Sequence, residues 1–127
     1  MYGLRPYHGH MSMSSHHAGA HASQPQDERR LEVAAGVLVL LADRTRLALL
    51  EQLGRGEADV TTLTEACGAP RPSVSQHLAK LRLAGLVTTR KDGRRVVYSL
   101  RHGHLRRLVE EALNVADHQI GGLPPHD

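Results

Sequence analysis

Histidine and aspartate side chains mark both ends of a segment near the C-terminus that we predict to be one helix. His102 and His104 stand at its start, Asp117 and His118 stand at its end, and His126 follows two prolines. Imidazole nitrogens and carboxylate oxygens bind divalent transition metals, so these residues are candidate metal ligands. The alternative is that a histidine at a helix end serves only as a favourable cation there.

The spacing of these residues decides how a shared site would be built. His104 and His118 are fourteen positions apart, which is roughly 21 Å along a helix. One helix cannot bring both ends to a single ion. Two such helices, antiparallel and from two subunits, would place His104 of one beside Asp117 and His118 of the other. The apolar positions for that pairing are Leu105, Leu108, Val109, Ala112, Leu113 and Ala116.

Residues 70–85 predict another helix, with two different faces. Pro72 suits the first helical turn, and Gly85 suits the left-handed residue that closes a helix. An apolar stripe for a core recurs at i, i+4 and i+7, on Val74, Leu78 and Leu81.

The opposite face of this helix carries small or hydrogen-bonding residues and one cation. Such residues near a helix N-terminus can approach base edges in a major groove, whereas a merely solvated face usually mixes Glu and Lys. For this helix alone, the solvated face stays an alternative. The DNA contacts that we predict on this helix are Ser73, Ser75, Gln76, His77 and Lys80.

The distribution of charge favours a nucleic-acid partner. Residues 70–107 contain ten basic side chains and one acid, Asp92, although the net charge of the whole chain is only +3. Such a surface suits phosphate. We expect no enzyme and no small organic substrate, because no nucleophile and base can be placed around an apolar pocket.

Length, cysteine count and hydropathy limit the class of protein. With 127 residues, 40% of them apolar, the chain predicts one small domain with a tail, and a small core favours oligomerisation. The single cysteine, Cys67, excludes a disulfide within one chain, and we expect it to be a small packing residue. No segment predicts a membrane span or a signal peptide, so we expect a cytoplasmic protein.

Three regions follow one another along the chain. Residues 1–26 lack acids and are rich in Gly, Ser and His, which predicts a disordered tail. Residues 27–120 form the folded domain, and residues 121–127 form a short tail with one candidate ligand, His126. The histidines of the first region either bind metal or belong to a tail without function; they are His8, His10, His16, His17 and His21.

The sequence of the folded domain predicts helices followed by a hairpin. Helices are expected at 27–42, 44–53, 62–67, 70–84 and 103–119, with Asp43 capping the second and a Thr62–Glu65 capping box starting the third. Asp92-Gly93 between two runs of β-formers predicts a hairpin. The result is a winged helix-turn-helix, mainly α with a β-hairpin wing. At the hairpin tip, Arg94 and Arg95 are predicted to contact phosphate or enter a minor groove.

Three blocks of this sequence resemble the ArsR/SmtB family of metal-responsive repressors. They are residues 40–47 (LLADRTRL), 72–81 (PSVSQHLAKL) and 92–100 (DGRRVVYSL), in the family's order and spacing. The resemblance covers roughly residues 30 to 120. It implies a homodimer, formed through the N- and C-terminal helices, that binds double-stranded operator DNA when metal-free and leaves it when metal binds.

Ligand positions within the family distinguish its metals. Sensors of arsenic, cadmium and lead place cysteines at the start of the third helix, where this chain has residues 60–63 without cysteine. The family's zinc and cobalt sensors that bind metal through the last helix carry His-x-x-His or His-x-x-Glu at its end. In this chain Val115, not a histidine, stands three residues before His118. The end of the chain is more similar to a nickel and cobalt sensor of the family. That resemblance implies the ligands His104, Asp117, His118 and His126, with Asp117 in place of a glutamate.

The expected function is therefore a repressor released by nickel or cobalt. Zinc remains an alternative metal, and a repressor that answers to redox state or to a partner protein remains an alternative without metal. A metal store built on the N-terminal histidines is disfavoured, because it leaves the cationic helix and hairpin unexplained.

Overall fold

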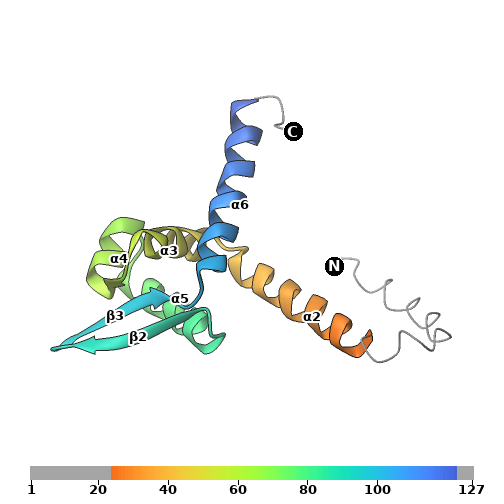
Figure 1. Ribbon diagram of the computed structural model, residues 1–127. Helices are drawn as coiled ribbons and strands as arrows, with labels where there is room; N and C mark the ends of the chain where they lie inside the picture. The colour runs from red at the N-terminus through yellow and green to blue at the C-terminus, as the bar shows by residue number, and fades with distance from the viewer. Residues whose placement is uncertain (1–23, 123–127) are drawn as a thin grey trace. The chain divides into compact units, whose positions relative to one another are not determined.

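The computed structural model describes residues 24–122, and the predictions for the N-terminal histidines and His126 lie outside these residues. Its elements (Figure 1) are α2 (Gln24–Leu41), α3 (Arg44–Arg55), β1 (Ala58–Asp59), α4 (Val60–Cys67), α5 (Arg71–Leu83), β2 (Val87–Asp92), β3 (Arg95–Leu100) and α6 (Gly103–Gly121). The fold is mainly α with a β-hairpin wing, as predicted. None of the helices described here is long and apolar enough to cross a membrane.

The chain divides into two compact units, residues 1–38 and 39–127, with the division inside α2. Apolar residues lie all round α2 in the sequence, which predicts a helix that is buried on several sides. That expectation is wrong for the single chain, where Leu31, Val33 and Leu38 are exposed and Leu41 is the helix's one fully buried residue. The single chain therefore leaves much of the apolar surface of α2 uncovered.

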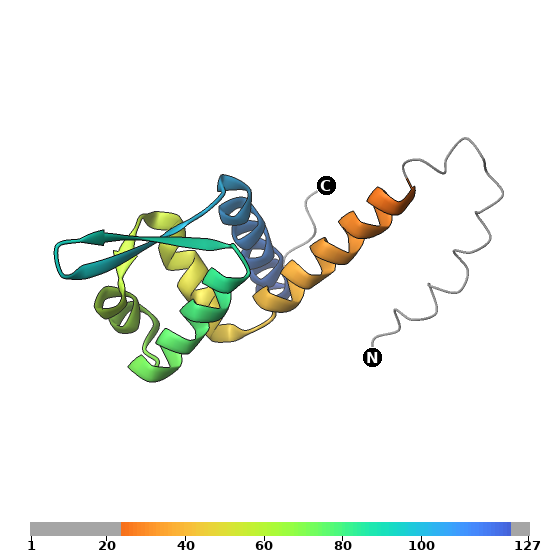
Figure 2. The same ribbon diagram turned by 90° about the horizontal axis from the view of Figure 1, so that it is seen from below.

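The core of the second unit is formed by leucines and valines from all of its helices and from the wing. Helices α3, α4 and α5 gather together, and the β2–β3 hairpin extends past them (Figure 2). The predicted stripe of α5 is confirmed, since its members have no exposed surface. The largest fully buried side chains are Leu49, Leu50, Leu63, Val74, Leu78, Leu81, Val87 and Val109.

Two aspartates cap helices α3 and α4, which precede α5 in the chain. Asp43 accepts a hydrogen bond from the Arg46 N–H at 2.9 Å and caps α3, as predicted. The predicted capping box at Thr62 is wrong. Helix α4 begins two residues earlier, because Asp59 accepts from the Thr62 N–H at 2.9 Å and takes the N-cap position.

The wing is a three-stranded antiparallel sheet in the order β1-β3-β2. The β2–β3 pairing runs from Val87 opposite Leu100 to Asp92 opposite Arg95, and the turn uses Gly93 with φ of 67°. The sequence predicted this hairpin but missed β1, which pairs Ala58 with Tyr98. A strand of two residues is too short to leave a periodic pattern.

The first half of helix α6 packs into the core. Leu105 and Val109 are its two buried residues, whereas Leu108 is 38% exposed and Val115 is 60% exposed. The sequence placed Leu105 and Val109 on a stripe for dimer pairing. Within this chain they pack inward instead, because α6 lies against α3 and β3.

Candidate nucleic-acid interface and effector residues

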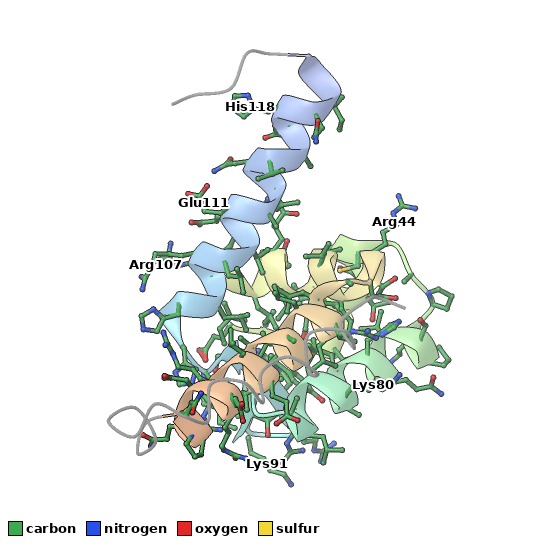
Figure 3. All side chains as sticks on the ribbon, turned by 90° about the vertical axis from the view of Figure 1, so that its right-hand side faces the viewer. Arg44, Lys80, Lys91, Arg107, Glu111 and His118 are labelled. Atoms are coloured by element: carbon green, nitrogen blue, oxygen red, sulfur yellow. The ribbon has the colours of Figure 1, made fainter. Side chains whose placement is uncertain are left out.

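The face of α5 predicted to approach bases is exposed. Ser75, Gln76, Ala79, Lys80 and Leu83 all lie on the surface, and Ser73 is partly exposed. Lys80 projects from α5 in Figure 3. The buried stripe turns inward, so the helix presents its short polar side chains and one cation to an approaching partner. This arrangement suits base contacts in a major groove.

The predicted DNA contact His77 is turned toward α3. Its side chain is 21% exposed, its Nδ1 lies 3.0 Å from Arg46 Nη1, and its Nε2 lies 3.8 Å from Asp43 Oδ2. These contacts hold the ring against the N-terminal end of α3. Its role as a DNA contact stays a prediction.

The basic residues of the wing fall into two groups. Arg90 forms two hydrogen bonds with the Glu57 carboxylate, at 3.1 and 2.7 Å, and Arg95 Nε lies 3.2 Å from Asp59 Oδ2. Arg94, in the turn, makes no hydrogen bond or ion pair with any residue that the structure describes. Arg94 is therefore available to a phosphate, whereas Arg95 already holds a carboxylate.

Both of these carboxylates are stabilised as anions. The side-chain hydrogen bonds from Arg90 hold the pKa of Glu57 below its ordinary value, and the Thr62 backbone N–H does the same for the pKa of Asp59, with a smaller effect of the Arg95 charge. Sequence reasoning missed Glu57 and Asp59. Their signal was the i, i+2 spacing, which puts two acids on one side of an extended segment.

The candidate metal ligands stand at the two ends of α6, as predicted. His104 is exposed, and its Nδ1 lies 2.7 Å from Arg107 Nη2. At the other end Asp117 is exposed and His118 is partly exposed. Figure 3 shows Arg107, Glu111 and His118 along one side of α6. Within residues 24–122, no three His, Cys, Asp or Glu side chains are close enough to hold a metal ion.

Cys67 is half-buried near the end of α4. Burial raises the pKa of its thiol above the ordinary value, and the Glu51 charge adds to that effect. The thiolate is the form that binds metal or attacks an oxidant. A raised pKa reduces the thiolate fraction at neutral pH, which agrees with a packing role.

The fold and these residues match known proteins. A helix-turn-helix domain model matches residues 41–90. The regulator KmtR of Mycobacterium tuberculosis is 47% identical over 102 residues, which cover 80% of this chain and 77% of KmtR. The chain belongs to the ArsR/SmtB family. The transcriptional repressor SmtB of the same species is 38% identical over 89 residues, covering 70% of this chain and 66% of SmtB.

Solved structures agree with this membership. A homodimeric winged helix-turn-helix DNA-binding domain from Mycobacterium bovis, described as a possible ArsR-family regulator, has a TM-score of 0.68. It is 29% identical, and the match covers 80% of this chain and 94% of that one. As an ArsR/SmtB member this chain is a transcriptional repressor with a winged helix-turn-helix, and it is not an enzyme.

Proposed function

We propose that the protein is a homodimeric metal sensor that binds its operator when metal-free and leaves it when nickel or cobalt binds. The observation that carries this proposal is the contrast between the predicted DNA contacts and the candidate metal ligands. The DNA-facing residues are arranged within one chain, whereas the candidate ligands stand at opposite ends of α6 and do not meet. A second chain is what would complete the ligand set.

On the DNA side, α5 enters the major groove and the wing reaches the backbone. Ser75 and Gln76 face the bases, with Ser73 at the N-terminal edge, and Lys80 holds a phosphate. Arg94 takes a further phosphate or the minor groove. Arg95 supports the hairpin through Asp59 and adds positive charge near the DNA.

On the effector side, the ligands are His104 of one subunit with Asp117 and His118 of the other, completed by His126. The donors fit a borderline divalent ion, because three imidazoles and one carboxylate suit nickel, cobalt or zinc. His104 can bind a metal ion through Nε2 only after the ring proton has moved from Nε2 to Nδ1. Arg107 only donates, so His104 Nδ1 now accepts and the ring proton lies on Nε2. Metal binding at Nε2 therefore requires Arg107 to turn away.

The exposed surface of α2 and α6 supports the dimer. Leu31 and Leu38 on α2, and Leu108 and Val115 on α6, are apolar and uncovered in the single chain. Exposed apolar surface of this kind is typical of subunit interfaces. When α6 of each subunit supplies half of a metal site, binding and the arrangement of the two α5 helices are linked, with a coupling of about 1 to 3 kcal/mol.

The choice of nickel or cobalt over zinc is supported by the similarity to KmtR, since the ligand set suits all three metals. The test is fluorescence anisotropy of the purified protein on DNA from upstream of its own gene, titrated separately with nickel, cobalt and zinc at fixed salt. Release by nickel or cobalt at lower free metal than zinc supports the proposal. Earlier release by zinc would transfer the assignment to zinc, and no release by any of the three would overturn the metal sensor.

A further inference from the structure

Arg46, in the first turn of α3, contacts two other helices with one side chain. Its Nε donates to the Leu40 carbonyl oxygen at 2.6 Å, and its Nη1 lies 3.0 Å from His77 Nδ1. Leu40 belongs to the last turn of α2, and His77 belongs to the recognition helix α5. All of these residues lie in the unit formed by residues 39–127. One guanidinium therefore connects the end of α2 with α5.

The chemistry of the two partners fixes the state of the His77 ring. A guanidinium has donors only, so His77 Nδ1 accepts the hydrogen bond and the ring proton lies on Nε2. That nitrogen faces Asp43 Oδ2 at 3.8 Å, and Asp43 is held in place by capping α3. Both nitrogens of His77 are thus directed at residues that begin α3.

The hydrogen bond between Arg46 and His77 restricts rotation of α5 about its own axis, which the apolar core restricts less well. Val74, Leu78 and Leu81 fix the depth of α5, but apolar contacts carry no direction. A hydrogen bond weakens steeply with angle, so the contact between Arg46 and His77 resists rotation of α5 about its own axis. Such a rotation would also turn the neighbouring residue Gln76 away from the groove.

In place of the DNA contact predicted for His77, we propose that Arg46 and His77 are positioning residues that set the rotation of α5 relative to the last turn of α2, and that neither contacts DNA. A second consequence, which rests on the proposed function, concerns the dimer. A shift in the last turn of α2, the helix we assign to subunit pairing, reaches the recognition helix through a single side chain.

The test compares operator binding of Arg46→Met and His77→Leu with a matched control, Arg55→Met. Arg55 lies at the other end of α3, where it pairs with Glu51 on the surface. Each arginine variant removes one positive charge from the same helix. Affinity for the DNA upstream of the gene, affinity for random DNA of equal length, and the slope of log affinity against log salt are measured without metal. Circular dichroism in urea checks that each variant is folded.

The expected result separates positioning from contact. Arg46→Met and His77→Leu each weaken operator binding about tenfold, because a charge-assisted hydrogen bond is lost. Binding to random DNA and the salt slope stay as in the wild type, and Arg55→Met changes none of these values. The double variant is no weaker than either single variant, because both remove the same interaction. His77→Asn keeps an acceptor and retains affinity within about twofold.

Other results would overturn the proposal. A salt slope lowered by about one unit in Arg46→Met or His77→Leu would identify a direct phosphate contact. Additive losses in the double variant would show that the two residues act independently. If a substitution to Met or Leu prevents folding, Arg46→Lys and His77→Asn replace them, and Arg46→Lys is expected to lose operator affinity while His77→Asn is not. Because no metal is present, a failure of metal release in the wild type would overturn the proposed function and leave this comparison intact.

Discussion

The recognition helix α5 and the last helix α6 hold their functional residues in different ways. In α5 the buried residues Val74, Leu78 and Leu81 span the helix, so the DNA-facing side is fixed by its own chain. In α6 the buried residues Leu105 and Val109 lie in the first half, and the second half carries its candidate ligands beyond the core. One chain is therefore sufficient to present the proposed DNA contacts, whereas the proposed metal site needs residues from a second chain.

The largest expected effect tests whether one chain is enough to hold α5. Leu78 has no exposed surface, so Leu78→Ala is expected to lower the free energy of unfolding by about 3 kcal/mol through lost burial and a cavity. Leu108, 38% exposed on α6, provides the comparison. Urea unfolding is measured at several protein concentrations. The cost of Leu78→Ala is expected to be independent of protein concentration, whereas that of Leu108→Ala shrinks on dilution, because a residue at the subunit interface stabilises the fold only while the dimer persists.

A contrary result would change the comparison directly. A cost of Leu78→Ala that varies with concentration would mean that α5 is also held by the partner. A constant cost of Leu108→Ala would remove this residue from the subunit interface.

The next effect tests whether the metal site is shared between chains. His104→Ala and His118→Ala homodimers are each expected to bind operator DNA within about twofold of the wild type and to ignore metal, because each lacks a ligand in both sites. In a mixed dimer, the intact His104 of one chain meets the intact His118 of the other. Unfolding and refolding the two variants together at equal amounts should restore about a quarter of the wild-type sites, by random pairing of subunits.

The readout for this mixture is metal bound per dimer, measured by equilibrium dialysis with nickel. The control is each variant refolded alone. Restored binding only in the mixture would support the shared site, and no restoration would show that each site is built within one chain.

The sequence predicted the features that depend on residues close together in the chain and missed those that depend on contacts between distant residues. The face of α5 was predictable, because helical periodicity alone separates Leu78 from Gln76. The orientation of His77 was not, because its partner Arg46 lies 31 positions away. Likewise the basic wing was visible in the sequence, but the pairing of Arg95 with Asp59 depends on β1, whose two residues leave no pattern.

For α6, the spacing of His104 and His118 was enough to predict that one helix could not join them. In the structure His104 lies in the first turn of α6 and His118 in its last turn. The contact between Arg107 and His104 was not predicted, although the i, i+3 spacing of the two residues on one helix permits it.

A smaller effect tests how the wing divides its charge. Arg94→Ala is expected to weaken operator binding about tenfold and to lower the salt slope by about one unit, because a phosphate contact is lost. The matched variant combines Arg95→Ala with Asp59→Asn, which removes both charges of an ion pair and keeps an N-cap residue for α4. Its salt slope is expected to match the wild type.

Anisotropy titrations between 50 and 200 mM salt, a range of about fourfold, give both slopes. If Arg95→Ala with Asp59→Asn lowers the slope as much as Arg94→Ala does, then Arg95 also contacts phosphate, and the wing presents two cations instead of one.

The smallest effect concerns the cap that begins α3 and supports α5. Asp43→Ala is expected to lower the free energy of unfolding by about 1 kcal/mol at pH 7, because the Arg46 N–H loses its acceptor. The same backbone hydrogen bond, with the charge of Arg46, holds the pKa of Asp43 below its ordinary value. A carboxylate with a lowered pKa stabilises the fold above the pKa of the unfolded chain and loses that contribution as pH falls through the folded pKa.

The difference in the free energy of unfolding between wild type and Asp43→Ala should therefore be constant from pH 7 to about pH 5 and should shrink below about pH 4. Urea unfolding at these pH values measures it, with Asp43→Asn as the control that keeps a cap and does not titrate. A difference that stays constant down to pH 3 would assign the stabilisation to the neutral cap alone. The charge of Asp43 would then contribute nothing to the N-terminal end of α3, on which the orientation of His77 depends.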